Sequence, residues 1–218
     1  MIRIAAFLRQ DRGATAAEFA LVLPVALLFL LGIIDVGRYA WAMNRMEKAV
    51  QMGTRYAVAT SIVPEGLNSK DFVGFDCGGT SVLGPGDPIC RDAIGTIACT
   101  GSPASCTCTP SALSGSCTGL PGNADNDAFT KIVNRMRVVS RSVQPGDVTI
   151  TYSGSGLGYA GDPSVADDGT PLSQVSPVVS VQVKGATFRS LVAFGAPLRL
   201  PTFRYSETLE DGDGSVAY

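Results

Sequence analysis

The chain has 218 residues, a formal net charge of −2 and only 17% charged residues, which is a suitable length for one domain with an appended segment. Such a weak charge, with no basic stripe, gives no electrostatic argument for a nucleic-acid partner, and we expect none. The sequence contains no histidine, so it lacks the commonest general base and the Ser–His and Cys–His nucleophile pairs. We therefore expect no catalytic residues, no cofactor and no enzyme activity.

The N-terminal region begins with a short basic stretch, residues 1–13, which ends in Gly13. Its arginines are Arg3, Arg9 and Arg12. From Phe19 to Ile34 the chain reads FALVLPVALLFLLGII, without a charge. Counted from Ala14, about twenty residues are available, enough to cross a bilayer as a helix. The arginines predict a single pass with the N-terminus in the cytoplasm and the remainder outside. A buried core helix, the alternative, fits this length poorly.

The helical pattern continues beyond the apolar run, to about Thr60. Apolar and small residues recur there at alternating spacings of three and four: Val36, Tyr39, Met43, Met46, Val50, Gly53 and Ala57. This spacing is typical of a helix with one apolar face. We expect residues 14–60 to form one membrane-spanning and assembly helix, whose outer half docks on its own globular domain.

The next segment, residues 61–123, is rich in Gly, Pro, Ser and Thr and reads as loops. It holds every cysteine of the chain: Cys77, Cys90, Cys99, Cys106, Cys108 and Cys117. An even number of clustered cysteines beyond a membrane-directed N-terminus favours disulfides in an oxidising compartment. Zinc is the alternative, since Cys106 and Cys108 are close in sequence, but no CxxC pair and no histidine is present. The spacing does not choose among the possible pairings, and we expect no metal.

The last segment, residues 124–218, has the pattern of a small α+β domain with an antiparallel sheet. A helix is predicted over 126–143, and a short helical turn over 188–194. Three stretches have strand character: 147–152 and 178–184, between the helix and the turn, and 201–206, after the turn. The residues between the first two strands, 153–176, read as a long loop.

Two further patterns in this segment resemble ligand sites only weakly. The glycines at 154, 156 and 158 lack the following helix that a phosphate-binding turn needs, so they indicate flexible loop. Acidic pairs at Asp167–Asp168 and at Asp211 and Asp213 lack the EF-hand spacing and are read as solvated turns rather than calcium sites.

Glu18 is the unusual residue of the N-terminal region, because a carboxylate beside an apolar run disfavours membrane insertion. On its own it reads as an interfacial residue that reaches headgroup water. Its surroundings, however, are Arg12-Gly13-Ala14-Thr15-Ala16-Ala17-Glu18-Phe19, followed at once by the apolar helix. This stretch resembles the processing site of type IV pilins and pseudopilins, and more narrowly the TadE-like family of minor pilins of the Flp (tight adherence) pilus. The continuation from Asp35-Val-Gly-Arg38 to Arg55-Tyr-Ala57 resembles the same family.

The resemblance implies a processing route and a role for Glu18. A prepilin peptidase would remove residues 1–13 as a leader by cutting after Gly13, on the cytoplasmic side. The mature chain would start at Ala14, with Glu18 as its fifth residue and Phe19 completing the recognition motif. Glu18 would then pair with the Ala14 amine of a neighbouring subunit, because charges that leave water need a partner. Pro24 removes one backbone donor and would kink the span.

The same resemblance implies partners and location. The partners would be the membrane, the prepilin peptidase, other pilin or pseudopilin subunits and the Tad inner-membrane assembly platform. The chain would cross the bacterial inner (cytoplasmic) membrane once, with its C-terminal domain in the periplasm or outside the cell, including in a surface pilus. Glycine at position 13 suits such a protease site, since it lacks a Cβ.

Two other interpretations stay open on the sequence alone. In one, general signal peptidase cuts after Ala40-Trp41-Ala42, and a secreted chain starts at Met43. In the other, the chain is an uncleaved single-pass anchor that displays a disulfide-rich binding module. Substituting Glu18→Gln separates these readings, because an anchor tolerates the change and a pilin loses incorporation.

Overall fold

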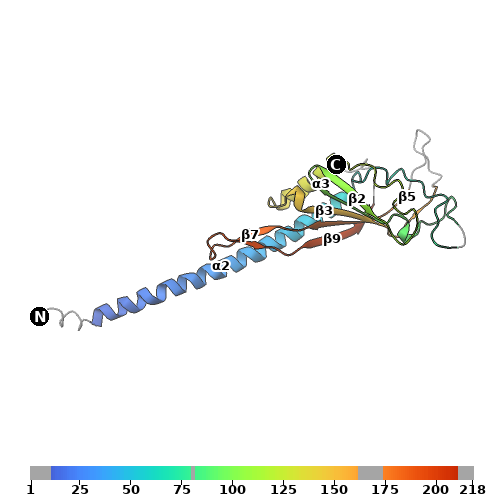
Figure 1. Ribbon diagram of the computed structural model, residues 1–218. Coiled ribbons are helices and arrows are strands. Elements are labelled where there is room, and N and C mark those ends of the chain that lie inside the picture. Colours follow the sequence, from blue (N-terminus) through green and yellow to red (C-terminus); the bar gives the residue numbers. More distant parts are fainter. Residues whose placement is uncertain (1–10, 80–81, 162–173, 211–218) are drawn as a thin grey trace, which may run out of the picture. The chain divides into compact units, whose positions relative to one another are not determined.

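The computed structural model describes residues 11–79, 82–161 and 174–210 (Figure 1). The chain divides into two compact units. Unit 1 comprises residues 1–43 and 187–198, and unit 2 comprises residues 44–186 and 199–218. The fold is α+β, as the sequence predicted. The acidic pairs at 167–168 and at 211 and 213 lie outside the described residues.

Helix α2, Asp11–Ala57, is the long N-terminal helix that the sequence predicted (Figure 1). Pro24 lies inside it, and the helix continues past the missing N–H of that residue. The helix ends before the expected Thr60. Thr60 Oγ1 donates to the backbone oxygen of Tyr56 at 2.9 Å, so a side chain takes one of the carbonyls left open at the helix end.

Unit 1 pairs the first part of α2 with a β-hairpin made of β7, Thr187–Arg189, and β8, Pro197–Arg199. The helical turn predicted over 188–194 is therefore wrong. A tight turn over 191–195 joins the strands, with Phe194 at φ 51° and Gly195 at φ 84°. A right-handed helix does not contain such positive φ angles, so the chain reverses here instead of continuing as a helix.

Unit 2 is built on a five-stranded antiparallel sheet with the order β2-β1-β3-β6-β9. The predicted strands appear as β3, Val148–Ser153, β6, Val178–Val183, and β9, Phe203–Thr208. Strands β1, Thr96–Gly101, and β2, Ala104–Thr109, come from the segment that the sequence read as loops. Minor elements are the pair β4, Gly158–Tyr159, with β5, Gln174–Val175, and the 3-10 turns Arg91–Ala93 and Pro145–Asp147.

Helix α3, Asn126–Val139, packs in the core of unit 2. Asp125 caps its start by accepting hydrogen bonds from the backbone N–H groups of Asp127 and Ala128. Its buried face consists of Ala128, Phe129, Ile132, Val133 and Met136, the periodicity that the sequence showed. The helix ends at Val139 rather than at 143, because the backbone of Ser140 is extended (φ −135°, ψ 105°).

The outer part of α2 docks on this domain, as expected from its apolar stripe. Met46, Ala49 and Val50 are buried. A Cβ added at Gly53 would lie only 2.5 Å from Met136 Cγ, so α2 and α3 approach each other closely at this glycine. Arg45 Nε donates to the backbone oxygen of Val139 at 3.0 Å and so satisfies a carbonyl at the end of α3.

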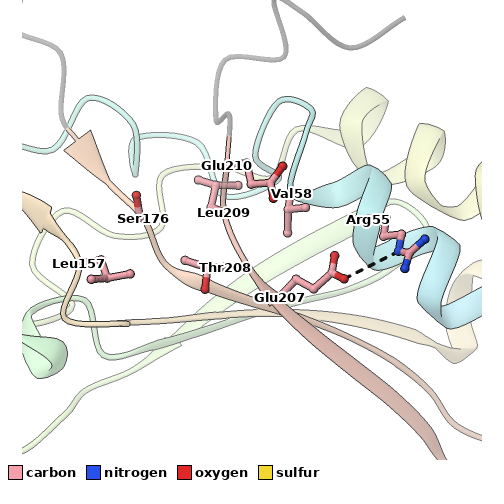
Figure 2. Close-up of a pocket in the computed structure, with 8 residues that line it drawn as sticks. All are labelled: Arg55, Val58, Leu157, Ser176, Glu207, Thr208, Leu209 and Glu210. Carbon is pink, nitrogen blue, oxygen red and sulfur yellow. Dashed lines mark ion pairs between the residues drawn. The ribbon is translucent and has the colours of Figure 1, made fainter.

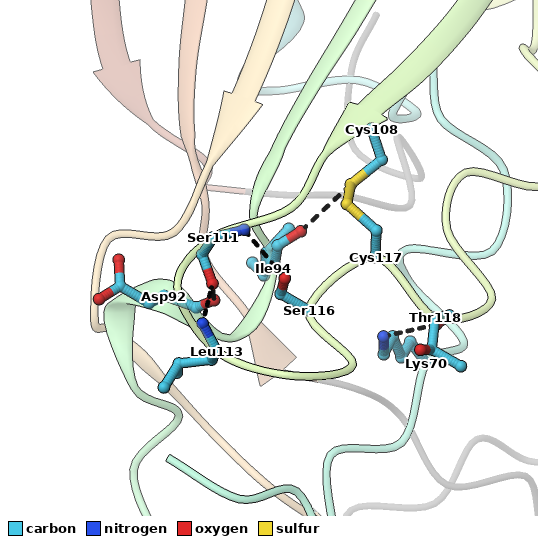
Figure 3. Close-up of a disulfide and its surroundings, with 9 residues drawn as sticks. All are labelled: Lys70, Asp92, Ile94, Cys108, Ser111, Leu113, Ser116, Cys117 and Thr118. Carbon is cyan, nitrogen blue, oxygen red and sulfur yellow. Dashed lines mark hydrogen bonds between the residues drawn. A yellow bond between two sulfur atoms is a disulfide. The ribbon is translucent and has the colours of Figure 1, made fainter. Parts of the chain in front are cut away.

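The six cysteines form three disulfides, Cys77–Cys90, Cys99–Cys106 and Cys108–Cys117, which confirms the predicted disulfides. Cys99 lies directly opposite Cys106 in the register of β1 and β2. Figure 3 shows how hydrogen bonds order the loop around the third disulfide: Ser111 Oγ donates to Asp92 O at 2.7 Å and accepts from Leu113 N at 3.0 Å. Among the described residues no group of three or more His, Cys, Asp or Glu could hold a metal ion.

Tyr152 on β3 connects the sheet to the chain that leaves α2. Its hydroxyl accepts a hydrogen bond from Val63 N at 3.1 Å, and its side chain is fully buried. Burial raises the pKa of Tyr152 well above its usual range, since the phenolate would lose its hydration. Tyr152 is therefore a neutral phenol in the folded state.

Candidate functional site

The apolar run of α2 lies uncovered along its whole length. Each large apolar side chain in it is exposed: Phe19, Leu21, Val22, Leu23, Val25, Leu27, Leu28, Phe29, Leu30, Leu31, Ile33 and Ile34. Among the described residues, one helix is long and apolar enough to cross a membrane; its most apolar window has a mean hydropathy of 2.7 and is 6% buried. A soluble domain rarely leaves so large an apolar surface in water. The helix could therefore cross a membrane by its length and composition.

Glu18 stands at the start of this run. Its side chain is exposed, and no ion pair or hydrogen bond joins it to another described residue. Gly13 and Ala14 belong to the first turns of α2, so Ala14 and Glu18 are four residues apart on one helix. The pairing expected between subunits, the cut after Gly13 and the kink at Pro24 stay predictions.

Directly after the apolar run, Asp35 forms a polar cluster that sequence reasoning did not single out as a site. Its side chain is almost fully buried, with the residue 8% exposed. One carboxylate oxygen, Oδ2, accepts hydrogen bonds from Ser190 Oγ at 2.6 Å, Leu191 N at 2.7 Å and Val192 N at 3.0 Å. The other oxygen accepts from Arg38 at 2.9 Å. A carboxylate leaving water requires this degree of compensation.

An aromatic contact extends the attachment of the hairpin along α2. The ring of Phe188 on β7 packs edge-to-face on Tyr39, with centroids 5.6 Å apart and an interplanar angle of 82°. The guanidinium carbon of Arg38 lies 5.2 Å from the centroid of the same Phe188 ring. Phe188 thus contacts residues 38–39, whereas the Ser190 hydroxyl and the N–H groups of Leu191 and Val192 contact Asp35. From Phe188 to its turn, the hairpin therefore runs along α2 in the direction of the N-terminus of the helix.

The local part of this cluster, Asp35 with Arg38, could be predicted from the sequence. Asp35 ends the apolar run and Arg38 follows one helical turn later, a spacing at which side chains meet. Ser190 is 155 residues away in the chain and sits in a stretch that was read as helical, so nothing local connected it to Asp35.

Unit 2 has an open hollow of about 710 Å³, shown in Figure 2. Arg55, Val58, Leu157, Ser176, Glu207, Thr208, Leu209 and Glu210 line it. The interaction drawn across it is the Arg55–Glu207 ion pair, at 3.8 Å, with Arg55 largely exposed. An exposed ion pair at this distance contributes little to stability, and these side chains do not form a nucleophile–base pair.

In a comparison with known proteins, the match falls within helix α2. Residues 13–55 match the family model for TadE-like proteins. This segment is similar to TadE-like proteins. The match begins at Gly13 and includes Glu18, Phe19 and Asp35, which confirms the resemblance that the sequence showed. No curated protein and no solved structure matches the chain significantly.

A TadE-like segment carried by an N-terminal apolar helix fits a component of a Tad pilus system. Residues 56–218, with the disulfides and the sheet, lie outside the matched range.

Proposed function

We propose that this protein is a minor pilin or pseudopilin-like component of a Tad-type pilus, which acts by assembly rather than by catalysis. The observation that carries the proposal is the exposed apolar run of α2, residues 19–34, which lies within the range that matches TadE-like proteins. A bilayer and a bundle of similar helices both remove a surface of this kind from water. A subunit that moves from membrane to fibre needs both environments.

In this proposal a prepilin peptidase cuts after Gly13 and releases a chain that starts at Ala14. The cut removes the arginines of the leader and exposes a new amine, which is charged at neutral pH. Glu18 of one subunit then pairs with the Ala14 amine of the next. An unpaired carboxylate among apolar helices is disfavoured, so the pair sets the axial stagger between neighbouring subunits.

The proposed location is the bacterial inner membrane, with the N-terminus in the cytoplasm and unit 2 outside it. The three disulfides of unit 2 support this orientation, because such crosslinks persist in oxidising compartments. The proposed partners are the prepilin peptidase, other pilin-like subunits and the Tad assembly platform of the inner membrane.

A charge-removing substitution tests the proposal. Glu18→Gln keeps the size of the side chain and removes its charge. In cells that carry the pilus machinery, we expect this variant to reach the membrane at the wild-type level and to lose incorporation into the assembly. Incorporation is measured by co-purification with sheared pili or with crosslinked neighbouring subunits.

Glu47→Gln is the matched control, since Glu47 is an exposed glutamate on the same helix. It should change neither membrane level nor incorporation. Wild-type incorporation of Glu18→Gln would contradict the pairing and would favour a membrane-anchored, disulfide-rich binding module instead.

A further inference from the structure

We propose that the turn between β7 and β8, residues 191–195, dips into the bilayer interface beside α2 and forms a second membrane contact of unit 1. The inference rests on the proposed function, in which residues 14–34 span the membrane. It concerns a part of the chain outside the TadE-like segment, far from it in sequence.

The position of the turn follows from the contacts of the hairpin with α2. Phe188 packs on Tyr39, whereas the following Ser190, Leu191 and Val192 bind Asp35. Four residues of helix correspond to about 6 Å along its axis, so the hairpin advances by about one turn toward the N-terminus between these contacts. The residues after Val192 therefore reach the level of Ile34, where the apolar run ends. Figure 1 shows the turn beyond β7 beside α2, on the side of its N-terminal part.

The turn itself is apolar and uncovered. It reads Leu-Val-Ala-Phe-Gly, with Leu191 50% exposed, Val192 36% and Phe194 99%. Phe194 adopts φ 51°, a conformation uncommon for a residue that is not glycine. The N–H of Phe194 donates to Leu191 O at 3.1 Å, which closes the turn. The side chain of Phe194, the largest in the turn, points away from the rest of the unit. The exposed apolar side chains of the turn and the uncommon backbone conformation of Phe194 together point to a binding role for this turn.

Charge and aromatic residues identify the environment as a bilayer interface. Behind the apolar turn lie two arginines, Arg38 on α2 and Arg189 on β7, both exposed. Trp41, 62% exposed, follows on α2. At a bilayer interface the acyl chains lie inside the layer of phosphate headgroups. The turn has the same order, with apolar side chains at its tip and arginines and a tryptophan behind them. The one carboxylate of the cluster, Asp35, accepts hydrogen bonds from four donors. It therefore presents no unpaired negative charge to the headgroups.

Continuity with the span decides between a bilayer and a second protein as the occupant. The turn and the apolar run belong to the same compact unit, and Asp35 follows Ile34 directly. A hairpin held at this level by three hydrogen bonds to Asp35 enters the interface whenever the helix spans the membrane. A neighbouring subunit would need to present an apolar surface at the same height.

Depth-dependent quenching tests the inference on the full chain. The natural tryptophan is first removed by Trp41→Phe, and single tryptophans are introduced by Phe194→Trp, Leu30→Trp or Val138→Trp. Leu30 lies in the proposed span, and Val138 is an exposed apolar residue of α3 in unit 2. Each variant is reconstituted into vesicles of phosphatidylcholine and phosphatidylglycerol, with or without bromine on the acyl chains.

We expect bromolipid to quench the emission of Phe194→Trp to an extent comparable with Leu30→Trp, and its emission to be blue-shifted. Val138→Trp should be neither quenched nor shifted. Quenching of Leu30→Trp without quenching of Phe194→Trp would overturn the inference and leave the span intact. A blue shift at position 194 without quenching would also overturn it, because the occupant would then be protein. Absence of quenching at both positions would refute the span and the inference with it.

Discussion

The packing of α2 on α3 gives a stability prediction with a defined sign. In the substitution Gly53→Val, the new Cβ would lie 2.5 Å from Met136 Cγ and 2.8 Å from its Sδ. Unstrained carbon contacts lie at about 3.5–4.0 Å, so the fully buried Met136 must move by about 1 Å or α3 must shift. Overpacking of this kind costs about 1–3 kcal/mol, and the two γ-methyl groups of valine place this case near the top of that range.

Helix propensity acts in the opposite direction but is smaller. Valine is preferred over glycine inside a helix by only about 0.4 kcal/mol. The expected net loss is therefore about 2.5 kcal/mol of unfolding free energy. The measurement is urea unfolding of the full chain in detergent micelles, followed by near-ultraviolet circular dichroism.

Gly37→Val is the matched control, because a Cβ at Gly37 on the same helix would meet no atom within 4 Å. It should stay within about 0.5 kcal/mol of the wild type. Combining Gly53→Val with Met136→Ala should cost less than the sum of the two single changes, by about 2 kcal/mol. Equal stability of Gly53→Val and Gly37→Val, or additive costs in the double variant, would refute the close approach of α2 and α3.

Three further predictions follow from the hairpin, the buried tyrosine and a disulfide. Asp35→Asn removes the charge that the Leu191 and Val192 amides bind, so hydrogen exchange at these amides should accelerate by at least tenfold; unchanged exchange would show that Asp35 does not hold the turn. Tyr152→Phe should cost about 1–2 kcal/mol by leaving Val63 N without its acceptor. Since the folded-state pKa of Tyr152 is raised, its stabilising contribution is present below pH about 10 and is lost above it, so Tyr152→Phe should also flatten the alkaline unfolding curve. An equally steep curve in the variant would assign alkaline unfolding to other groups. Replacing Cys77 and Cys90 together by serine opens a loop with a sequence separation of 13 and should cost about 3 kcal/mol in urea unfolding; a loss below about 1 kcal/mol would mean that this loop is ordered without its crosslink.

The elements that the sequence predicted are those with local signals. The apolar run, its amphipathic continuation and the α3 periodicity each need only neighbouring residues to be recognised. The alternation of Val179, Val181 and Val183 with polar residues likewise predicted β6.

The elements that were missed depend on residues far away in the chain. Strands β1 and β2 are rich in Thr, Ser and Cys, and their order comes from pairing with β3 and from the Cys99–Cys106 disulfide. Composition alone therefore made them resemble loops. The turn at 191–195 is fixed by Asp35, more than 150 residues earlier, so its apolar sequence was read as a short helix.

The central claim, that this is a processed subunit of a Tad-type pilus, is tested most directly by the N-terminal residue of the mature protein. The chain is expressed in cells that carry the prepilin peptidase, purified from the membrane fraction, and its N-terminal peptide is identified by mass spectrometry. A start at Ala14 is the predicted result, with Glu18 as the fifth residue. A start at Met1 or at Met43 would contradict the claim, because the chain would then be an uncleaved anchor or a secreted domain.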